Sequence, residues 1–375
     1  MKRLLIVLPM VAALALGACG DDDPTGPEDP APQEFVVLSW NVYVGADLTQ
    51  LLAIEDPAQI ACGVGAVYDD VLATEFETRA RAIADQIAAQ EPLVIGLNEV
   101  STFDFAGNTV HEDLVFLDVL LDELTARGLN YAAPEAARSM NFEISLPISY
   151  AVDCAPQDLV SYSEYDVLLV QGDLGLDGAD NGRFAQPLPL PFGLDPKYSG
   201  WAYVDLQHES SPYRVFTTHL EPGDTGPCET NDPGLLFVHT EQAAELMQIL
   251  DESPYPIILT GDLNSDASGC TTPTYPALIG AGFVDAWSEG SGIGSGFTAN
   301  EDGDLRNETS ALYHRIDFVL YRDESTVLTG EFPGSVDVDL LGEDPADRIA
   351  TTFGYLVWPS DHAGVLAGLT FVAGS

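Results

Sequence analysis

Side chains that could do chemistry stand where apolar runs of this chain end. The stretches SWNVYVGADL, VIGLNEV, TTHLEP, LTGDLNSD, HRIDFVL and WPSDHAG each bring a carboxylate, an amide or an imidazole to the end or the middle of an apolar run. Carboxylate and amide oxygens are ligands for hard divalent cations, and imidazole transfers protons near neutral pH. The residues concerned are Asn41, Glu99, His219, Asp262, Asn264, Asp317, Asp361 and His362.

Asp361 and His362 are neighbours in the last of these stretches. Neighbouring side chains of a regular strand point to opposite faces of the sheet. The two can serve one site only from a turn, and the apolar run at 363–371 is the strand that would follow this turn. The groups that the pair faces must therefore come from other segments of the chain.

Strands and helices alternate in a pattern that would gather these polar ends. Spacing of apolar residues at 74–90, 111–127 and 236–251 predicts amphipathic helices, and short apolar runs predict strands. Because many strands have helices between and around them, we expect an α/β layered sandwich with its site on the loops at strand ends. The stretch 134–200 is rich in Pro and Gly and gives the least clear pattern. The predicted strands are 35–40, 92–97, 213–220, 255–263, 315–321 and 363–371.

The N-terminus has the features of an export signal. Lys2 and Arg3 precede a short apolar run that reaches Ala15, which is too short to span a bilayer as a mature helix. The stretch LGAC resembles the bacterial lipobox. That resemblance implies cleavage before Cys19 and lipidation of its sulfur.

These features divide the chain into three parts. We predict a lipoprotein signal peptide at 1–18, an acidic and Pro-rich tether at 19–34 and one folded domain at 35–375. Gly20 is not the aspartate that usually retains a lipoprotein in the inner membrane. We therefore expect the protein in the cell envelope, lipid-anchored to the outer membrane or cell surface. We also expect a monomer.

The chain is strongly acidic, with 13 Lys and Arg, 60 Asp and Glu and a formal net charge of −47. Loss of the signal peptide would leave Lys197 as the only lysine. A wide nucleic-acid footprint needs rows of basic side chains against phosphates, which this sequence lacks. A small site where metal ions meet a single phosphate group remains compatible with the composition.

Cysteine usage predicts disulfide bonds. With Cys19 used for a lipid, an even number of cysteines is left in an exported chain, which indicates two disulfides. Three pairings can be drawn, and we favour Cys62–Cys154 and Cys228–Cys270, because the second pair follows two candidate site strands.

The ordered set of polar ends resembles the endonuclease/exonuclease/phosphatase superfamily. The motifs GDLN and SDH, with NV and NE before them, carry the resemblance across residues 35–371. Members include pancreatic deoxyribonuclease, abasic-site endonucleases, inositol polyphosphate 5-phosphatases and bacterial sphingomyelinases. The family fold is a four-layer α/β/β/α sandwich (DNase I-like). NVY, LNEV and THLEPGDTGPC look like the sphingomyelinases, and NVYVGADLTQLL, RFAQPLPLP, GAGFVDAW and LVWPSDHAGVLA are closer still to a group of exported bacterial members.

The resemblance implies a metal-dependent phosphoric ester hydrolase. Asn41, Glu99 and Asp361 would hold Mg²⁺ or Mn²⁺, with Ca²⁺ as a further candidate. The remaining site residues would be catalytic. Asp262 would orient or deprotonate the attacking water, and Asn264 would donate to a phosphate oxygen.

The two histidines would complete the chemistry. His219 would contact the phosphate or protonate the leaving group, and His362 would face the phosphate with its tautomer fixed by Asp317. Nucleases of the superfamily have a further acidic or Tyr residue from the middle of the chain near the first histidine. Tyr165, Asp166 and Asn181 are the candidates here.

Several functions compete at this stage. The first is an exported metal-dependent phosphodiesterase, with a phospholipid headgroup or nucleic acid as its phosphoester substrate. Alternatives are a sphingomyelinase-like phospholipase C, an extracellular nuclease, a phosphomonoesterase and a non-catalytic surface lipoprotein. A binding protein would be expected to have lost an essential position, and all are present. A lipid-directed enzyme needs an apolar edge, for which the sequence offers Phe353, Tyr355, Leu356, Val357 and Trp358.

Overall fold

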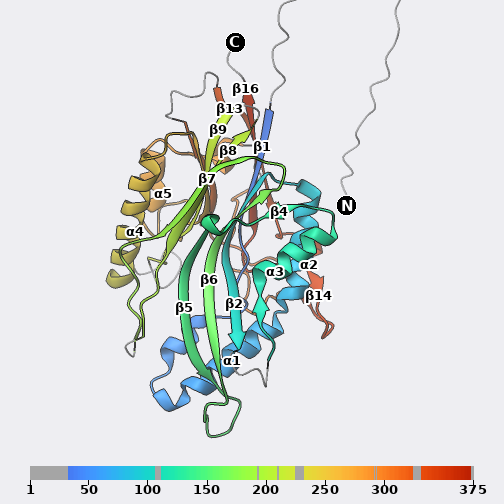
Figure 1. The fold of residues 1–375 in the computed structure, drawn as a ribbon, viewed down its shortest axis with the longest axis vertical. Helices are drawn as coiled ribbons and strands as arrows, with labels where there is room; N and C mark the ends of the chain where they lie inside the picture. The colour runs from blue at the N-terminus through green and yellow to red at the C-terminus, as the bar shows by residue number, and fades with distance from the viewer. Residues whose placement is uncertain are drawn as a thin grey trace, which may run out of the picture.

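The computed structural model describes residues 33–105, 111–191, 194–208, 211–223, 232–290, 292, 294–323 and 331–372 (Figure 1). Two β-sheets pack face to face, and helices cover the outer side of each sheet. The predicted four-layer α/β/β/α sandwich is therefore confirmed. The predicted signal peptide, the lipidated Cys19 and most of the tether lie outside the described residues.

The first sheet has the strand order β13-β16-β1-β2-β6-β4, with β3 paired to β2 and β5 paired to β6. The second sheet has the order β11-β12-β10-β9-β8-β7, and β14 and β15 form a separate hairpin. The strands of the first sheet are β1 (Gln33–Asn41), β2 (Val94–Phe105), β3 (Leu114–Val115), β4 (Tyr131–Ala132), β5 (Arg138–Ile148), β6 (Asp158–Gln171), β13 (Glu331–Leu341) and β16 (Gly364–Val372). The others are β7 (Leu176–Arg183), β8 (Gly200–His208), β9 (Ser211–His219), β10 (Ile257–Asp262), β11 (Val284–Asp285), β12 (Asp317–Arg322), β14 (Ile349–Ala350) and β15 (Leu356–Val357).

Helices flank the two sheets on opposite sides (Figure 1). Apolar faces of α1, α2 and α3 share a core with the first sheet, and those of α4 and α5 share another with the second. Among the described residues, no helix combines the length and apolar character that a membrane crossing requires. The helices are α1 (Ile60–Ala73), α2 (Phe76–Gln90), α3 (Phe116–Ala126), α4 (Pro233–Asp251), α5 (Thr274–Gly280) and α6 (Ala286–Glu289).

A third core fills the space between the sheets. Val37, Val94, Val215 and Ile258 all lie there, fully buried. The neighbours β1 and β2 are parallel, as are β9 and β10. Parallel strands buried on both faces need continuous apolar runs. These runs are what made the strands predictable, and their polar ends fall together because parallel strands end at the same edge.

Differences from the predicted elements are local. The helix predicted at 111–127 begins only at Phe116, because Leu114 and Val115 pair with β2 as β3. Residues of α1 were not predicted to be helical. The stretch 134–200 contains the long strands β5 and β6, which pair over most of their length. The first strand begins at Gln33, so the last two residues of the predicted tether belong to the fold.

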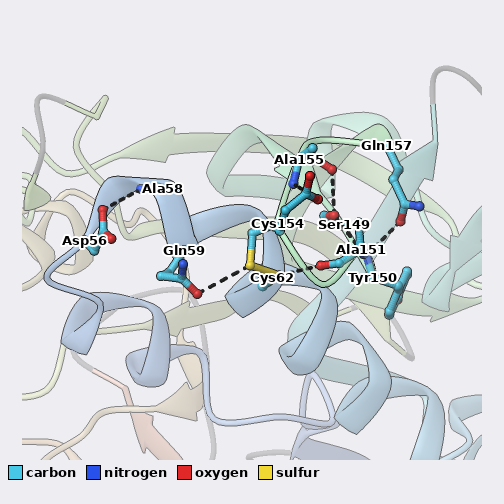
Figure 2. Close-up of a disulfide and its surroundings, with 11 residues drawn as sticks. Asp56, Ala58, Gln59, Cys62, Ser149, Tyr150, Ala151, Cys154, Ala155 and Gln157 are labelled. Atoms are coloured by element: carbon cyan, nitrogen blue, oxygen red, sulfur yellow. Dashed lines mark hydrogen bonds between the residues drawn. A yellow bond between two sulfur atoms is a disulfide. The ribbon is translucent and has the colours of Figure 1, made fainter.

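One predicted disulfide is present. Cys62 on α1 is bonded to Cys154, which lies on the turn between β5 and β6 (Figure 2). The bond closes a sequence separation of 92 residues and fixes α1 to the far end of the long hairpin. Cys228 lies outside the described residues, so its pairing with Cys270 stays a prediction.

Gly261, in the GDLN motif, is required by the packing of β10 on β9. Its φ is +142°, and a Cβ atom there would lie 2.1 Å from the backbone oxygen of Thr218. Both conditions exclude a larger residue. The close approach brings the next residue, Asp262, level with His219 on the neighbouring strand.

Candidate active site

Strand ends from both sheets meet at one place. In the first sheet, β1 and β2 set Asn41 opposite Asn98. In the second, Asp262 pairs with His219 on one side and with Asp317 on the other. The two sheets are joined directly, because Asn41 Nδ2 donates to Asp262 Oδ2 at 3.2 Å. Five strands therefore contribute to one polar cluster, and the turn that carries Asp361 and His362 adds a sixth segment, with His362 Nδ1 3.9 Å from Asp262 Oδ2.

Glu99 lies at an irregularity in β2. The register of β2 against β6 shifts between Leu97 and Val100, and Glu99 has a φ of 58°. Such a bulge turns a side chain away from its regular direction. The Glu99 carboxylate accepts from Asn41 Nδ2 and from the backbone N–H of Val44, both at 3.0 Å.

His362 is paired with a buried carboxylate. Its Nδ1 lies 2.8 Å from Asp317 Oδ2, and the Trp40 indole donates to its backbone oxygen at 3.0 Å. Burial alone would lower the pKa of His362, but Asp317 and Asp361 raise it well above its ordinary value. The contact fixes the ring with its Nδ1 proton pointing to Asp317, the partner that the family resemblance implied, and favours an imidazolium near neutral pH.

His219 is held differently. Its Nε2 lies 3.1 Å from Asn264 Nδ2 and 3.6 Å from Asp262 Oδ2, while its buried Nδ1 has no hydrogen-bond partner among the described residues. Burial would lower the pKa of His219, but Asp262 and Asp166 raise it overall. A neutral ring can accept from Asn264, and a protonated ring can donate to Asp262. His219 can therefore hold or release a proton without moving far.

The turn after β10 shapes the centre of the site. Asn264 has a φ of 45°, and its backbone N–H donates to Asp262 Oδ1 at 2.9 Å. The Asn264 amide donates to the backbone oxygen of Leu220 at 2.7 Å as well as meeting His219. Both amide protons are used in this rotamer, so here Asn264 positions His219 rather than offering a free donor to phosphate. Burial, followed by the charge of Asp317, raises the pKa of Asp262.

Asp361 occupies the turn before β16, as predicted. Its backbone oxygen accepts from Asn300 and Glu301, and Ser360, next to it, donates through Oγ to the backbone oxygen of Asn41 at 2.7 Å. Burial raises the pKa of Asp361 to about 7; the charge of His362 lowers it and that of Glu99 raises it. The loop thus holds Asp361 beside the end of β1.

Sequence reasoning missed Asn98. This fully buried amide donates to Asp166 Oδ1 at 2.8 Å, and its Oδ1 accepts from the backbone N–H of Asp262 at 3.1 Å. Asp166 also accepts from Asn141 Nδ2 at 2.8 Å, and burial raises its pKa to about 6. Asn98 stands directly before Glu99 in the motif LNEV. Two consecutive polar residues at a strand end were therefore the available signal.

Of the three mid-chain candidates, only Asp166 joins this network. Tyr165 and Asn181 instead line a separate hollow of about 770 Å³, whose walls contain none of the predicted metal ligands or catalytic residues. Alternation along β6 explains the difference between Tyr165 and Asp166, because neighbouring side chains of a strand face opposite sides.

Arg79 was also missed, although it is fully buried. Its guanidinium donates to the backbone oxygens of Val42, Tyr43 and Pro359 at 2.7, 2.9 and 3.1 Å. These carbonyls belong to the loops that carry Asn41 and Asp361. One side chain on α2 therefore fixes both loops to each other.

The donor set fits a hard divalent cation. Asn41, Glu99 and Asp361 offer only carboxylate and amide groups, and the charge of Glu99 raises the pKa of Asp361. Carboxylates that are held together against their repulsion are the ligands that Mg²⁺ and Mn²⁺ bind. Atoms of Asp262, Asp317 and His362 also lie within 4.8 Å of one another. We assign that second group to proton handling, because His362 Nδ1 already lies 2.8 Å from Asp317 Oδ2.

Comparisons with known proteins agree with this geometry. Residues 38–362 match the Endonuclease/Exonuclease/phosphatase family. Members of this family hydrolyse phosphoric esters and depend on divalent metals. Comparison with curated proteins found no match.

Solved structures share the fold at low sequence identity. An endonuclease/exonuclease/phosphatase family protein from Bacteroides thetaiotaomicron is 16% identical with a TM-score of 0.53, covering 91% of this chain and 98% of that one. The mannosyl-6-phosphatase of Bacteroides thetaiotaomicron VPI-5482 is 16% identical with a TM-score of 0.53, covering 90% and 100%. An endonuclease/exonuclease/phosphatase from Beutenbergia cavernae DSM 12333 is 18% identical with a TM-score of 0.51, covering 91% and 72%.

Proposed function

The chain belongs to the endonuclease/exonuclease/phosphatase family and is a metal-dependent phosphoric ester hydrolase, and from that premise we propose that it is a phosphodiesterase acting outside the cytoplasm. The observation that carries the proposal is one cluster in which the His362–Asp317 pair stands beside Asp262, itself bonded to Asn41. We propose Mg²⁺ as the ion, with Mn²⁺ or Ca²⁺ as substitutes.

The charge of the site favours a diester over a monoester. Buried carboxylates surround it, and Lys197, the one lysine in the described part of the chain, is already paired with two glutamates. A phosphodiester carries one negative charge near neutral pH, whereas a monoester carries close to two. Bringing the second charge into a carboxylate-rich, partly desolvated site costs more. The mannosyl-6-phosphatase with this fold does not decide the question, because likeness at 16% identity extends to the fold alone.

The attack would be supported by residues of the second sheet. A bound divalent ion would polarise the phosphoryl group and offset charge on its oxygens. Asp262, whose pKa is raised by burial, would accept the proton of the attacking water. His362, kept protonated by Asp317, would place its positive charge beside the phosphate oxygens as the water oxygen bonds to phosphorus.

His219 would support the departure of the leaving group. As the ester P–O bond breaks, the protonated ring would give its proton to the leaving oxygen, which leaves as an alcohol. Asn264 would then hold the neutral ring that remains, by donating to its Nε2. The proton balance closes, because one proton passes from water to Asp262 and one from His219 to the leaving group.

A membrane lipid is the second candidate substrate, and the β14–β15 hairpin favours it. At the turn of this hairpin Phe353 is 71% exposed, and Leu356, the first residue of β15, is also exposed. Apolar side chains at a hairpin tip can enter a lipid surface. Val357 and Trp358 are fully buried, so the predicted apolar edge is smaller than the sequence indicated. A sphingomyelinase-like phospholipase C would use this edge, and Phe353→Ser should then weaken turnover of sphingomyelin liposomes while leaving bis-p-nitrophenyl phosphate hydrolysis unchanged.

The place of action follows from the lipobox-like LGAC motif. We propose that Cys19 carries a lipid that anchors the protein to the outer membrane or cell surface. Metabolic labelling with palmitate should mark the wild-type protein but not Cys19→Ser. Equal labelling of both proteins would contradict the anchor without affecting the catalytic proposal.

A substrate panel tests the function. The purified full chain should hydrolyse bis-p-nitrophenyl phosphate with Mg²⁺ and lose this activity with EDTA. Sphingomyelin liposomes and plasmid DNA in the same panel separate the lipid-directed enzyme from a nuclease. Turnover of monoesters alone would replace the diesterase proposal with a phosphatase, and turnover of no phosphoester with any divalent metal would favour a binding protein.

A further inference from the structure

A lysine and two glutamates lie beside the proposed catalytic residues but take no part in the steps above. Glu221 follows His219 by two residues, and Glu164 precedes Asp166 by two residues on the same face of β6. Lys197 Nζ lies 3.5 Å from Glu164 Oε1 and 3.4 Å from Glu221 Oε1. The residue after the lysine is tied to the site as well, because the backbone N–H of Tyr198 donates to Asn141 at 3.0 Å.

The position of this cluster is on the His219 side of the site. The charge of Lys197 lowers the pKa of His219, and the charge of Glu99 raises the pKa of Lys197. Ser199 fixes Glu221 by donating to its Oε1 at 2.9 Å. The cluster therefore borders the histidine that would protonate the leaving oxygen, which is where the alcohol half of a substrate would lie.

The hydrogen bonds of the cluster are incomplete. Glu164 Oε2 accepts from the Tyr162 hydroxyl at 2.9 Å, but the buried Oε1 has no hydrogen bond within the described part of the chain. A buried carboxylate oxygen without such a bond is costly. The Lys197 ammonium has three donors, only two of which face glutamates, and its side chain is 23% exposed. The cluster thus offers a carboxylate oxygen that is held only by its ion pair with Lys197, beside a partly exposed ammonium with a donor to spare, and a hydroxyl group matches both.

Resting on the function proposed above, we propose that Glu164, Lys197 and Glu221 form the subsite for the leaving alcohol and select a neutral alcohol that carries hydroxyl groups, such as glycerol or a sugar. Two carboxylates repel a leaving group with further phosphates, as in a nucleic acid. The ammonium of Lys197 repels a quaternary ammonium, as in a choline ester, because it is the exposed charge of the cluster while both glutamates are buried. A neutral polyol meets neither repulsion and supplies the missing hydrogen bond.

Matched diesters test the subsite in the full-length protein with Mg²⁺. Glycerophosphoglycerol and glycerophosphocholine share one glycerol half and differ only in the other alcohol, and a short thymidine oligonucleotide adds further phosphates. We expect kcat/KM for glycerophosphoglycerol to exceed that for the other two by about tenfold or more, the usual effect of one well-placed hydrogen bond and one avoided charge contact. Hydrolysis of bis-p-nitrophenyl phosphate without this preference would overturn the subsite and leave the phosphodiesterase proposal standing.

Variants separate recognition from a merely structural ion pair. Glu164→Gln should reduce the ratio of kcat/KM for glycerophosphoglycerol over bis-p-nitrophenyl phosphate about tenfold, and the partly exposed Lys197→Met should raise relative turnover of glycerophosphocholine. Glu123→Gln is the matched control, because Glu123 is paired with Arg127 at 2.7 Å on the surface and should leave the ratio unchanged. An unchanged ratio in folded Glu164→Gln and Lys197→Met would show a structural role and overturn the proposal.

Binding tests the subsite even if no diester is hydrolysed. Calorimetric titration of His362→Ala with Mg²⁺ should show glycerol 1-phosphate binding at least about tenfold more tightly than phosphocholine. Equal affinities, or tighter binding of phosphocholine, would overturn the subsite. Absence of turnover together with the expected order of affinities would instead count against the phosphodiesterase proposal alone.

Discussion

His362 and His219 approach the same oxygen of Asp262, at 3.9 and 3.6 Å, yet their surroundings differ. His362 has a carboxylate on Nδ1 at 2.8 Å. His219 has an amide and a carboxylate on Nε2 and no partner for Nδ1 among the described residues. A ring fixed by a buried carboxylate keeps its proton, whereas a ring between a neutral donor and an acid can exchange one. The difference indicates that the two histidines divide the work into charge compensation and proton transfer.

The largest expected effect comes from removing the fixed histidine. His362→Ala should reduce kcat/KM on bis-p-nitrophenyl phosphate by ~10²–10⁴-fold, because a positioned imidazole contributes an effect of this size. Steady-state kinetics with Mg²⁺ measures it. Asp317→Asn should lose part of the same activity, and full activity in both variants would show that this pair is not catalytic.

The exchangeable histidine should show a dependence on the leaving group. His219→Gln should cost ~10²-fold on an alkyl diester, whose leaving oxygen needs a proton, but less than ~10-fold on bis-p-nitrophenyl phosphate, whose phenol leaves as an anion. Parallel kinetics on both substrates gives the comparison. Equal losses on the two substrates would contradict the role of His219 as proton donor.

The carboxylate near His219 should leave a trace in stability against pH. Burial raises the pKa of Asp166 to about 6, above the value of roughly 3.9 in an unfolded chain. Between these values the folded state binds more protons than the unfolded state, so this contribution to stability is present below about pH 4 and lost as the pH rises through 6. The shift corresponds to up to about 3 kcal/mol.

Urea unfolding of the wild type and Asp166→Asn across this range isolates that contribution. The wild type should lose free energy of unfolding relative to the variant as the pH rises from about 4 to above 6. A difference that stays constant with pH would mean that Asp166 titrates normally in the folded protein.

A smaller effect is expected from Arg79, which joins the two loops that carry Asn41 and Asp361. Arg79→Lys keeps the charge but cannot reach all three carbonyls, so Mg²⁺ affinity should fall about tenfold, the lower end of the range for residues that position metal ligands. Calorimetry on the apoprotein measures affinity without turnover, and Arg81→Lys on the same helix is the control. Unchanged affinity in a folded Arg79→Lys would remove this residue from the site.

Much of this arrangement could be predicted, because parallel buried strands leave continuous apolar runs that end in polar residues. Asn41, His219 and Asp262 were predictable for that reason. Asn98 was not, because the bulge at Glu99 breaks the alternation from which a strand's faces are inferred. The predicted roles of the site residues stay predictions until they are assayed.

Other parts of the structure had weaker signals in the sequence. Arg79 stands three residues after Phe76 and four before Ile83, on the apolar face of α2. A lone arginine on such a face could have indicated a buried structural role. The β5–β6 hairpin was obscured by polar and Pro residues, because its strands extend beyond the core and alternate between buried and exposed positions.

The most direct test of the account is metal-dependent turnover by the full chain and by Glu99→Gln. With bis-p-nitrophenyl phosphate as substrate, we expect the wild type to lose activity in EDTA and to recover it with Mg²⁺, and Glu99→Gln to need far more Mg²⁺ for a small fraction of that rate. Activity that persists in EDTA, or that is the same in Glu99→Gln, would contradict a catalytic metal held at this cluster.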